Sequence, residues 1–140
     1  MISENKLKHS LGVARQCEAL ANENGMTEEA QMACFVMGFL HDIGYESASE
    51  ITKHPVESGN YIDAFLKHKD LCVDAIKNHG KRRDDFSVFD IILNTADLTV
   101  NYEGSSVSVN DRLEGIKQRH GEDSIHYQHA VEIVEYYGIK

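Results

Sequence analysis

The segment AQMACFVMGFLHDIG, residues 30–44, constrains the fold most, because it is apolar on almost every side before it reaches a histidine and an aspartate. A helix that is apolar all round is usually buried, so we expect a central helix that reaches Leu40. Thr27 is its expected N-cap. Asp42 then falls at the carboxyl end of the helix, where the helix dipole disfavours a carboxylate. A bound cation would offset both this dipole and the burial of Asp42, whereas His41 alone is favourable there without any ligand role.

Helical patterns dominate the rest of the chain, and no stretch alternates apolar and polar residues long enough to predict a convincing strand. Caps and stop glycines predict six further helices, at about 3–24, after Pro55, and at 70–79, 87–100, 110–121 and 124–138. A length of 140 residues fits one domain with a buried core. We therefore expect a compact all-α single domain of six or seven helices, over residues 1–140.

One predicted helix, residues 87–100, carries a polar stripe on an otherwise apolar sequence. The stripe follows helical spacing and consists of Asp90, Asn94, Asp97 and Asn101. Ser87 and Asp90 form an expected capping box, and Asp90 is interpreted as part of a solvated face. Asp97 lies deep in the helix between apolar residues, so a metal or active-site role is favoured there over a solvated one.

Two histidines continue apolar lines on their predicted helices and should point inward. These are His9 on the first helix and His79 on the helix at 70–79. A single inward histidine is more often a satisfied core residue than a ligand. A larger set favours a metal site, and its members are His9, His41, Asp42, His54, His79 and Asp97. Imidazole and carboxylate together suit iron, manganese, zinc or cobalt, and the absence of cysteine from the set argues against structural zinc.

Four further basic and imidazole side chains are interpreted as surface groups. His126 and His129 are three residues apart on the last predicted helix, but they have no carboxylate in a similar apolar setting. Arg112 and Arg119 are expected to pair with acidic residues on the surface. These four residues are therefore not included in the predicted site.

Charge and cysteine content limit the class of protein. The net charge of −9 argues against a broad nucleic-acid surface. Three separate cysteines without a CxxC pair are expected to be buried thiols in a reducing compartment. The N-terminus lacks a signal-peptide pattern and no apolar run is long enough to cross a bilayer, so a cytoplasmic protein without a membrane segment is expected.

The ordered residues of the candidate set, with the contexts LHDIG and TADLT, resemble the HD-domain superfamily of metal-dependent phosphohydrolases. The resemblance covers residues 1–103 and leaves 104–140 as a C-terminal helical extension. The chain is also similar to small bacterial HD proteins, including the symmetrical diadenosine tetraphosphate hydrolases. It differs from those in a shorter segment between Asp42 and His54 and in lacking their arginine-containing signature after Asp97.

The resemblance implies roles for these residues. His9, His41, Asp42 and Asp97 would hold one divalent metal, while His54 and His79 would hold a second, with Asp42 bridging the two. A metal-activated water would then hydrolyse a nucleotide, dinucleotide or other small phosphate ester, and Asp42, His54 and His79 would be the catalytic residues. With only one metal, His54 and His79 would instead contact the substrate or donate a proton.

The loop HGKRRDD supplies expected substrate contacts in Lys81 and Arg82, because arginine can clamp phosphate oxygens with two hydrogen bonds. The alternative is a basic loop paired with Asp84 and Asp85. Two other functions stay open: an HD-superfamily di-iron oxygenase acting on a small organic substrate, and a non-catalytic helical module stabilised by metal. The sequence leaves the exact substrate, the metal and the oligomeric state open.

Overall fold

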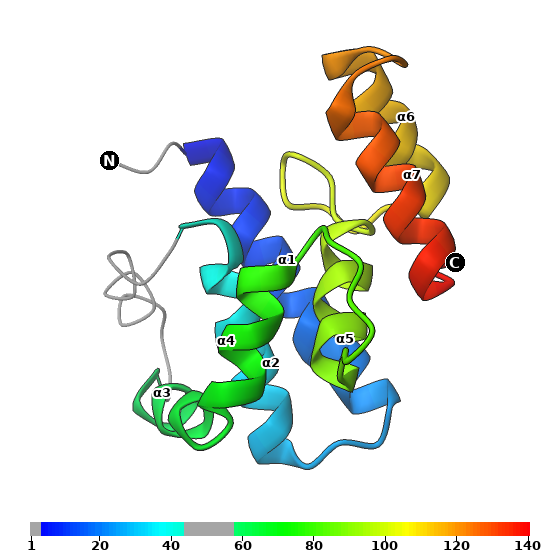
Figure 1. Ribbon diagram of the computed structural model, residues 1–140. Helices are drawn as coiled ribbons and strands as arrows, with labels where there is room; N and C mark the ends of the chain where they lie inside the picture. The colour runs from blue at the N-terminus through cyan, green and yellow to red at the C-terminus, as the bar shows by residue number, and fades with distance from the viewer. Residues whose placement is uncertain (1–3, 44–57) are drawn as a thin grey trace.

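The described part of the chain, residues 4–43 and 58–140 of the computed structural model, is built from helices (Figure 1). Their bounds are α1 (Glu4–Glu23), α2 (Glu28–Ile43), α3 (Ser58–Lys67), α4 (Lys69–Asn78), α5 (Val88–Asp97), α6 (Val109–His120) and α7 (Ile125–Tyr137). Within these residues the β structure is limited to one isolated bridge between Val100 and Ser106. The predicted all-α fold is confirmed.

The main core lies where α1 and α2 cross. A Cβ atom on Gly38 would lie 2.8 Å from the Cys17 sulfur and 2.9 Å from the Ala14 Cα atom, so only glycine permits this approach. Met37 and Phe39 are fully buried beside it. All three cysteines are buried and unbridged, as expected, and burial raises the pKa of the Cys34 thiol to about 12. No helix in the described ranges has the length and apolar character needed to span a bilayer.

Helix α2 ends later than the sequence analysis predicted. It continues through Ile43 rather than ending at Leu40, so His41 and Asp42 lie on its last turn. Helix α5 ends at Asp97, earlier than the predicted end at residue 100, and Leu98 is its C-cap. Both shifts place candidate ligands at helix ends, where side chains can reach across to neighbouring helices.

Helix α5 begins with the predicted capping box. The Ser87 hydroxyl accepts from Phe89 N, and the Asp90 carboxylate accepts from Ser87 N. The prediction of a solvated Asp90 is wrong, because Asp90 has no exposed surface and its oxygens accept from Arg83 Nε at 3.1 Å and Nη2 at 2.6 Å. The helical pattern alone could not indicate the burial of Asp90, because its partner Arg83 comes from the preceding loop and not from the same helix face.

Helices α6 and α7 form an antiparallel pair beside the α1–α5 body (Figure 1). Ser108 caps α6, two residues before the predicted Asn110, whereas Ser124 caps α7 as predicted. The pair has its own apolar cluster, formed by Leu98, Val109, Ala130, Ile133 and Ile139. The larger cluster of α1–α5 does not include these residues. The two clusters support, as a proposal, the division into a core at 1–103 and an extension at 104–140.

Candidate metal centre

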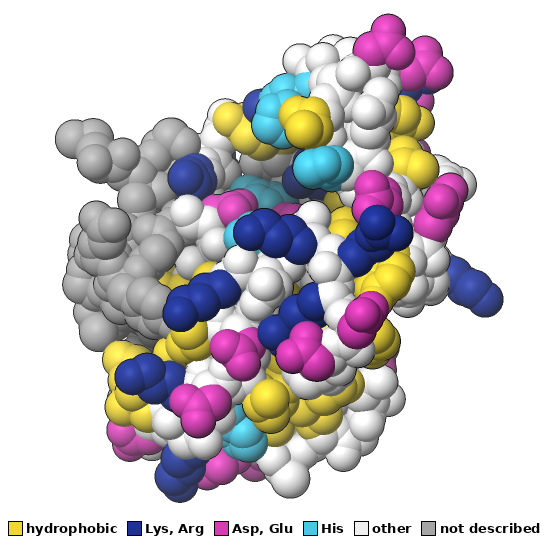
Figure 2. Space-filling view, in the orientation of Figure 1, with side chains coloured by type: hydrophobic (Ala, Val, Ile, Leu, Met, Phe, Trp, Pro, Cys, Tyr) yellow, Lys and Arg dark blue, Asp and Glu magenta, His cyan; other side chains and the backbone are white. Residues whose placement is uncertain are grey.

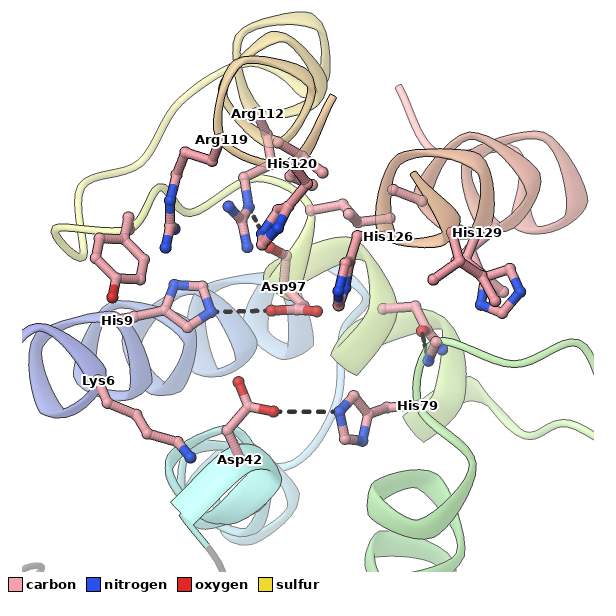
Figure 3. Close-up of a pocket in the computed structure, with 18 residues that line it drawn as sticks. Lys6, His9, Asp42, His79, Asp97, Arg112, Arg119, His120, His126 and His129 are labelled. Carbon is pink, nitrogen blue, oxygen red and sulfur yellow. Dashed lines mark hydrogen bonds and ion pairs between the residues drawn. The ribbon is translucent and has the colours of Figure 1, made fainter. Parts of the chain in front are cut away.

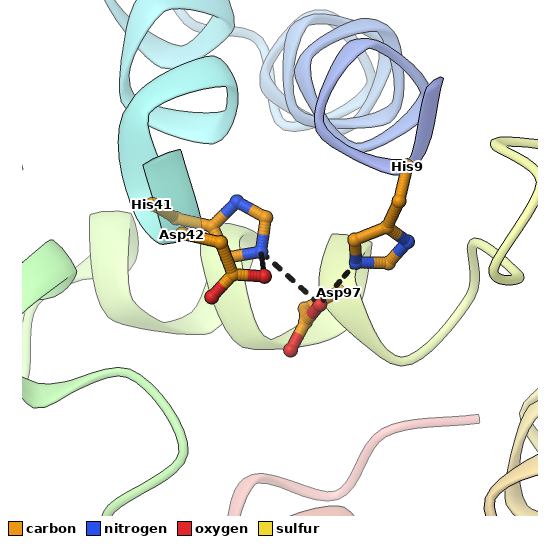
Figure 4. Close-up of side chains that lie close together, drawn as sticks. All are labelled: His9, His41, Asp42 and Asp97. Carbon is orange, nitrogen blue, oxygen red and sulfur yellow. Dashed lines mark hydrogen bonds and ion pairs between the residues drawn. The ribbon is translucent and has the colours of Figure 1, made fainter. Parts of the chain in front are cut away.

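Four side chains from three helices converge at one point. His9 comes from α1, His41 and Asp42 from α2, and Asp97 from α5 (Figure 4). Each offers one nitrogen or oxygen atom, and these atoms all lie within 4.8 Å of one another. Because His9, His41 and Asp97 are far apart in sequence, only the packing of α1, α2 and α5 assembles this group.

The contacts inside the group join imidazole nitrogens to carboxylate oxygens. Asp97 Oδ1 lies 3.0 Å from His9 Nε2 and 3.3 Å from His41 Nε2. His41 Nε2 also lies 3.0 Å from Asp42 Oδ2. His9 and His41 are buried, while the side chains of Asp42 and Asp97 keep 36% and 24% of their surface exposed. The carboxylates are therefore the members of the group that face the solvent side.

The second ring nitrogen of each imidazole is fixed by a backbone carbonyl. His9 Nδ1 donates to Asn101 O at 2.9 Å, and His41 Nδ1 donates to Gly38 O at 2.6 Å. A carbonyl can only accept, so the proton of a neutral ring lies on Nδ1 and the lone pair of Nε2 faces a carboxylate. Two lone pairs repel, so a proton or a shared cation must lie between each Nε2 and its carboxylate.

His79 repeats this arrangement one step away. It follows the last residue of α4, its Nδ1 donates to Ile76 O at 2.6 Å, and its Nε2 lies 3.3 Å from Asp42 Oδ1. The turn is held because Gly80 N donates to the buried Asn94 side chain at 2.8 Å. Asp42 thus lies between His41 on one oxygen and His79 on the other.

The electrostatics of the group follow from these contacts. Burial favours a neutral His41, but hydrogen bonds to Asp42 and Asp97 outweigh burial and raise the pKa of His41 to about 10. Burial also raises the pKa of Asp97, yet hydrogen bonds from His41 and His9 hold that pKa well below its ordinary value. The balance is the same for Asp42, whose pKa is lowered by His41 and His79. Without a cation, the group holds its carboxylates charged by protonating imidazole.

The donor set also fits a divalent transition metal. Ligand atoms at about 2.1 Å from such an ion, separated by right or tetrahedral angles, lie roughly 3.0–3.4 Å apart. The nitrogen–oxygen contacts of 3.0 to 3.3 Å fall in this range. Nε2 atoms backed by Nδ1–H donation to carbonyls are the usual form of a histidine ligand. The residues present therefore suit an ion bound by His9, His41, Asp42 and Asp97.

The other predicted site residues lie in different places. His54 is outside the described residues. Lys81 and Arg82 line a small hollow of about 210 Å³ beside His129, and Arg82 Nε lies 2.6 Å from Glu132 Oε1. That ion pair joins the α4–α5 loop to α7, rather than to the acidic neighbours in the loop.

A larger cavity of about 620 Å³ opens onto the group formed by His9, His41, Asp42 and Asp97. We call this group the metal cluster, for the ion that it is suited to bind. His9, Asp42, His79 and Asp97 line one side (Figure 3). The opposite side comes from α6 and α7, and its polar members are Arg112, Arg119, His120, His126 and His129. In the space-filling view, imidazole and basic side chains gather around the hollow between this hairpin and the rest of the molecule (Figure 2).

The sequence analysis placed these hairpin residues on the surface and away from the site. His126 and His129 are indeed exposed, but they border the cavity. Arg112 has no acidic side-chain partner among the described residues, and its Nε donates to the Asp97 carbonyl at 3.2 Å. Arg119 lies over the Tyr102 ring, 3.5 Å from the centroid. The signal available in the sequence was the clustering of two arginines and three histidines within 112–129.

Comparison with known proteins gives a consistent result. A family model described as HD domain matches residues 7–102. The chain is 35% identical over 95 residues to ribonuclease Y of Onion yellows phytoplasma, which is 68% of this chain and 17% of that protein. It is also 35% identical over 94 residues to ribonuclease Y of Enterococcus faecalis, covering 67% and 18%. The chain thus spans less than a fifth of these relatives. No solved structure gave a significant match.

Proposed function

This chain belongs to the HD domain family, and from that premise we propose that it is a metal-dependent hydrolase of phosphoric ester or anhydride bonds. One observation carries the proposal. Imidazole Nε2 atoms, each with its Nδ1 bonded to a carbonyl, and two carboxylates converge within 4.8 Å of one another at a cavity of about 620 Å³. This volume lies in the range of small-molecule sites.

We assign His9, His41, Asp42 and Asp97 to one metal position. The second position is proposed for His54 and His79, with Asp42 shared between the two. A bound divalent ion supplies Lewis-acid activation of water and neutralises charge on phosphate oxygens. We propose that the metal is iron, manganese, cobalt or zinc, because this donor set accommodates each of them.

Groups of the protein itself would orient the imidazole rings and protonate the leaving group. The carbonyls of Asn101 and Gly38 fix the rings of His9 and His41, so that Nε2 is presented to the cavity side. His79 is held in the same way by Ile76 O. If a single metal binds, His79 is the proton donor to the leaving group, because its Nε2 lies between Asp42 and the cavity.

For the substrate, we propose a nucleotide or dinucleotide, the class to which the symmetrical diadenosine tetraphosphate hydrolases also point. Lys81 and Arg82 are proposed as its outer contacts. The cavity volume of about 620 Å³ and the net charge of −9 support a small phosphorylated molecule over a long polyanion. The second candidate is a phosphodiester bond of RNA, which the name of the ribonuclease Y relatives favours.

The test joins metal content to hydrolysis. The protein, loaded with Mn²⁺, Co²⁺ or Fe²⁺, is expected to release phosphate or nucleotide from a panel of nucleotides, dinucleotides and short RNA. Asp97→Ala and Asp42→Ala are expected to lose both bound metal and activity, because each removes a carboxylate that faces the imidazole nitrogens. Asp63→Ala, an exposed change on α3, is the matched control and should retain both.

Two results would overturn the assignment. Retention of metal and activity by Asp97→Ala would show that the ligand set is wrong. Silence across the panel, together with oxygen uptake by the iron form, would favour the oxygenase reading of the same ligands.

A further inference from the structure

We propose that the inner face of the α6–α7 hairpin is a second anion site, which binds a further phosphate group of the substrate while the first lies at the metal cluster. We call this face the hairpin wall and define it by Arg112, Arg119, His120 and His126. The inference rests on the proposed function and narrows its substrate to compounds with at least two linked phosphates, such as nucleoside diphosphates and triphosphates.

The charged groups that line the cavity differ between its two sides, although Lys6 also lines it on the side of Asp42 (Figure 3). The carboxylates among its described lining residues are Asp42 and Asp97, and both belong to the metal cluster. The hairpin side contributes two guanidinium groups, from Arg112 and Arg119. A metal ion would neutralise the carboxylates, so the loaded cavity would be positive throughout, inside a protein with a net charge of −9.

The guanidinium groups are held in place before any ligand arrives. The Arg119 guanidinium lies 3.5 Å from the centroid of the Tyr102 ring, a close cation–π contact that holds the group flat. Arg112 Nε donates to the carbonyl of Asp97 at 3.2 Å, which ties the hairpin wall to a residue of the metal cluster. Figure 3 shows both arginine side chains directed from α6 toward the layer of His9 and Asp97. A planar fork positioned in advance loses less entropy when it binds phosphate.

The histidines of the wall complete a site for negative charge. The rings of His120 and His126 have centroids 4.3 Å apart. Desolvation is the largest cause that lowers the pKa of His120, and the neighbouring His126, Arg119 and Arg112 lower it further. A phosphate group would reverse this effect and draw a proton onto the ring. Figure 3 shows the His126 ring directed from α7 into the cavity beside Asp97, the space that a phosphate chain would cross.

The size of the cavity favours a small molecule. About 620 Å³ accommodates a nucleotide and its phosphate chain, whereas a long RNA would extend over a surface of net negative charge. A compound with one phosphate would engage the metal cluster alone. A polyphosphate chain would engage both sides, so we expect selectivity for it.

The first experiment measures binding without hydrolysis. Metal-free protein is titrated with inorganic tripolyphosphate and with orthophosphate by calorimetry, and tripolyphosphate is expected to bind more tightly. Arg119→Gln should weaken tripolyphosphate binding roughly ten- to hundredfold, the usual effect of losing a charge-assisted contact. Arg119→Lys, which keeps the charge but loses the fork, should be intermediate. Lys117→Gln is the matched control, since Lys117 lies on the same helix but does not line the cavity.

The second experiment measures selectivity in the metal-loaded protein. The ratio of kcat/KM for a nucleoside triphosphate to that for the monophosphate should fall at least about tenfold in Arg119→Gln and stay at the wild-type value in Lys117→Gln. Bound metal, measured in parallel, should be the same in both variants, because Arg119 is not a proposed ligand.

The outcomes separate the two proposals. Tripolyphosphate binding that depends on Arg119, without hydrolysis of any phosphate compound, would support the hairpin wall and overturn the proposed function. Hydrolysis with an unchanged selectivity ratio in Arg119→Gln would support the proposed function and overturn the hairpin wall. A short RNA that competes with tripolyphosphate and is hydrolysed with higher kcat/KM than the triphosphate would overturn the choice of a small molecule.

Discussion

The Nδ1 atoms of His9, His41 and His79 are each committed to a backbone carbonyl, so their chemistry is left to Nε2. As a result, each of the three imidazoles has the same nitrogen, Nε2, available to bind a metal or a proton. The sequence indicated the inward direction of His9 and His79 from apolar periodicity. The carbonyl partner of His9 could not be predicted, because Asn101 lies in the segment after α5, whereas the partner of His79 is a local carbonyl three residues earlier.

At this scale we predict that metal binding releases protons. His41 has a pKa raised to about 10, so it is protonated in the metal-free protein at neutral pH, whereas a metal ligand must be neutral. Metal affinity should therefore rise with pH. Calorimetry of metal binding at pH 7, repeated in buffers of different ionisation enthalpy, should report close to one proton or more released per chain.

In the metal-free protein, the raised pKa of His41 makes the stability of the fold fall as the pH rises, whereas metal affinity rises with pH. A raised pKa for His41 stabilises the fold below its ordinary value of 6.5, and this stabilisation is lost as the pH rises toward about 10. The lowered pKa of Asp97 stabilises the fold at pH values above its ordinary pKa, and this stabilisation is lost in acid.

Metal affinity that does not change between pH 6 and 8 would contradict protonation of His41.

Helix α5 shows how one element serves several purposes. Of its polar stripe, Asp97 contacts His9 in the candidate metal centre, Asn94 holds the turn after His79, and Asp90 is buried against Arg83. The spacing of four, three and four in the sequence predicted one polar face. It could not predict that the face is buried at one end, because the covering residue comes from the α4–α5 loop.

At the scale of elements we predict unequal costs for two neighbouring arginines. Arg83→Met should lower the free energy of unfolding by roughly 3 kcal/mol, because it leaves the fully buried Asp90 carboxylate without its cation. Arg82→Met should cost less than about 1 kcal/mol, because Arg82 and Glu132 form an exposed pair. Denaturant unfolding of both variants measures the difference, and equal losses would contradict the buried role of Asp90.

At the scale of the whole molecule, two apolar clusters divide the chain. The larger one joins α1 to α5, and the smaller one holds the α6–α7 hairpin against the end of α5. Polar contacts also secure the hairpin, since the hydroxyls of Tyr136 and Tyr137 donate to the carbonyls of Arg83 and Lys81. The hairpin is therefore attached through one end of α5 and one loop.

We predict that the hairpin opens more readily than the α1–α5 core. Ile133→Ala should reduce amide protection from hydrogen exchange in α6 and α7, by an amount equivalent to about 2–3 kcal/mol, while α1 and α2 keep their protection. Ile125→Ala is the matched control on the same helix, because Ile125 is 64% exposed. A uniform loss of protection across all helices would instead mean that the chain unfolds as a single unit.

The sequence by itself determined the helices, the capping residues Ser87 and Ser124, and the candidate ligands, because periodicity, caps and inward direction are local properties. The tertiary structure alone decided which backbone carbonyl fixes the His9 ring, which cation covers Asp90, and which wall faces the candidate metal centre. The hairpin residues look like ordinary surface groups in the sequence because their neighbours are polar. They border the cavity only because the α6–α7 hairpin packs against the end of α5, a contact between segments that no local pattern records.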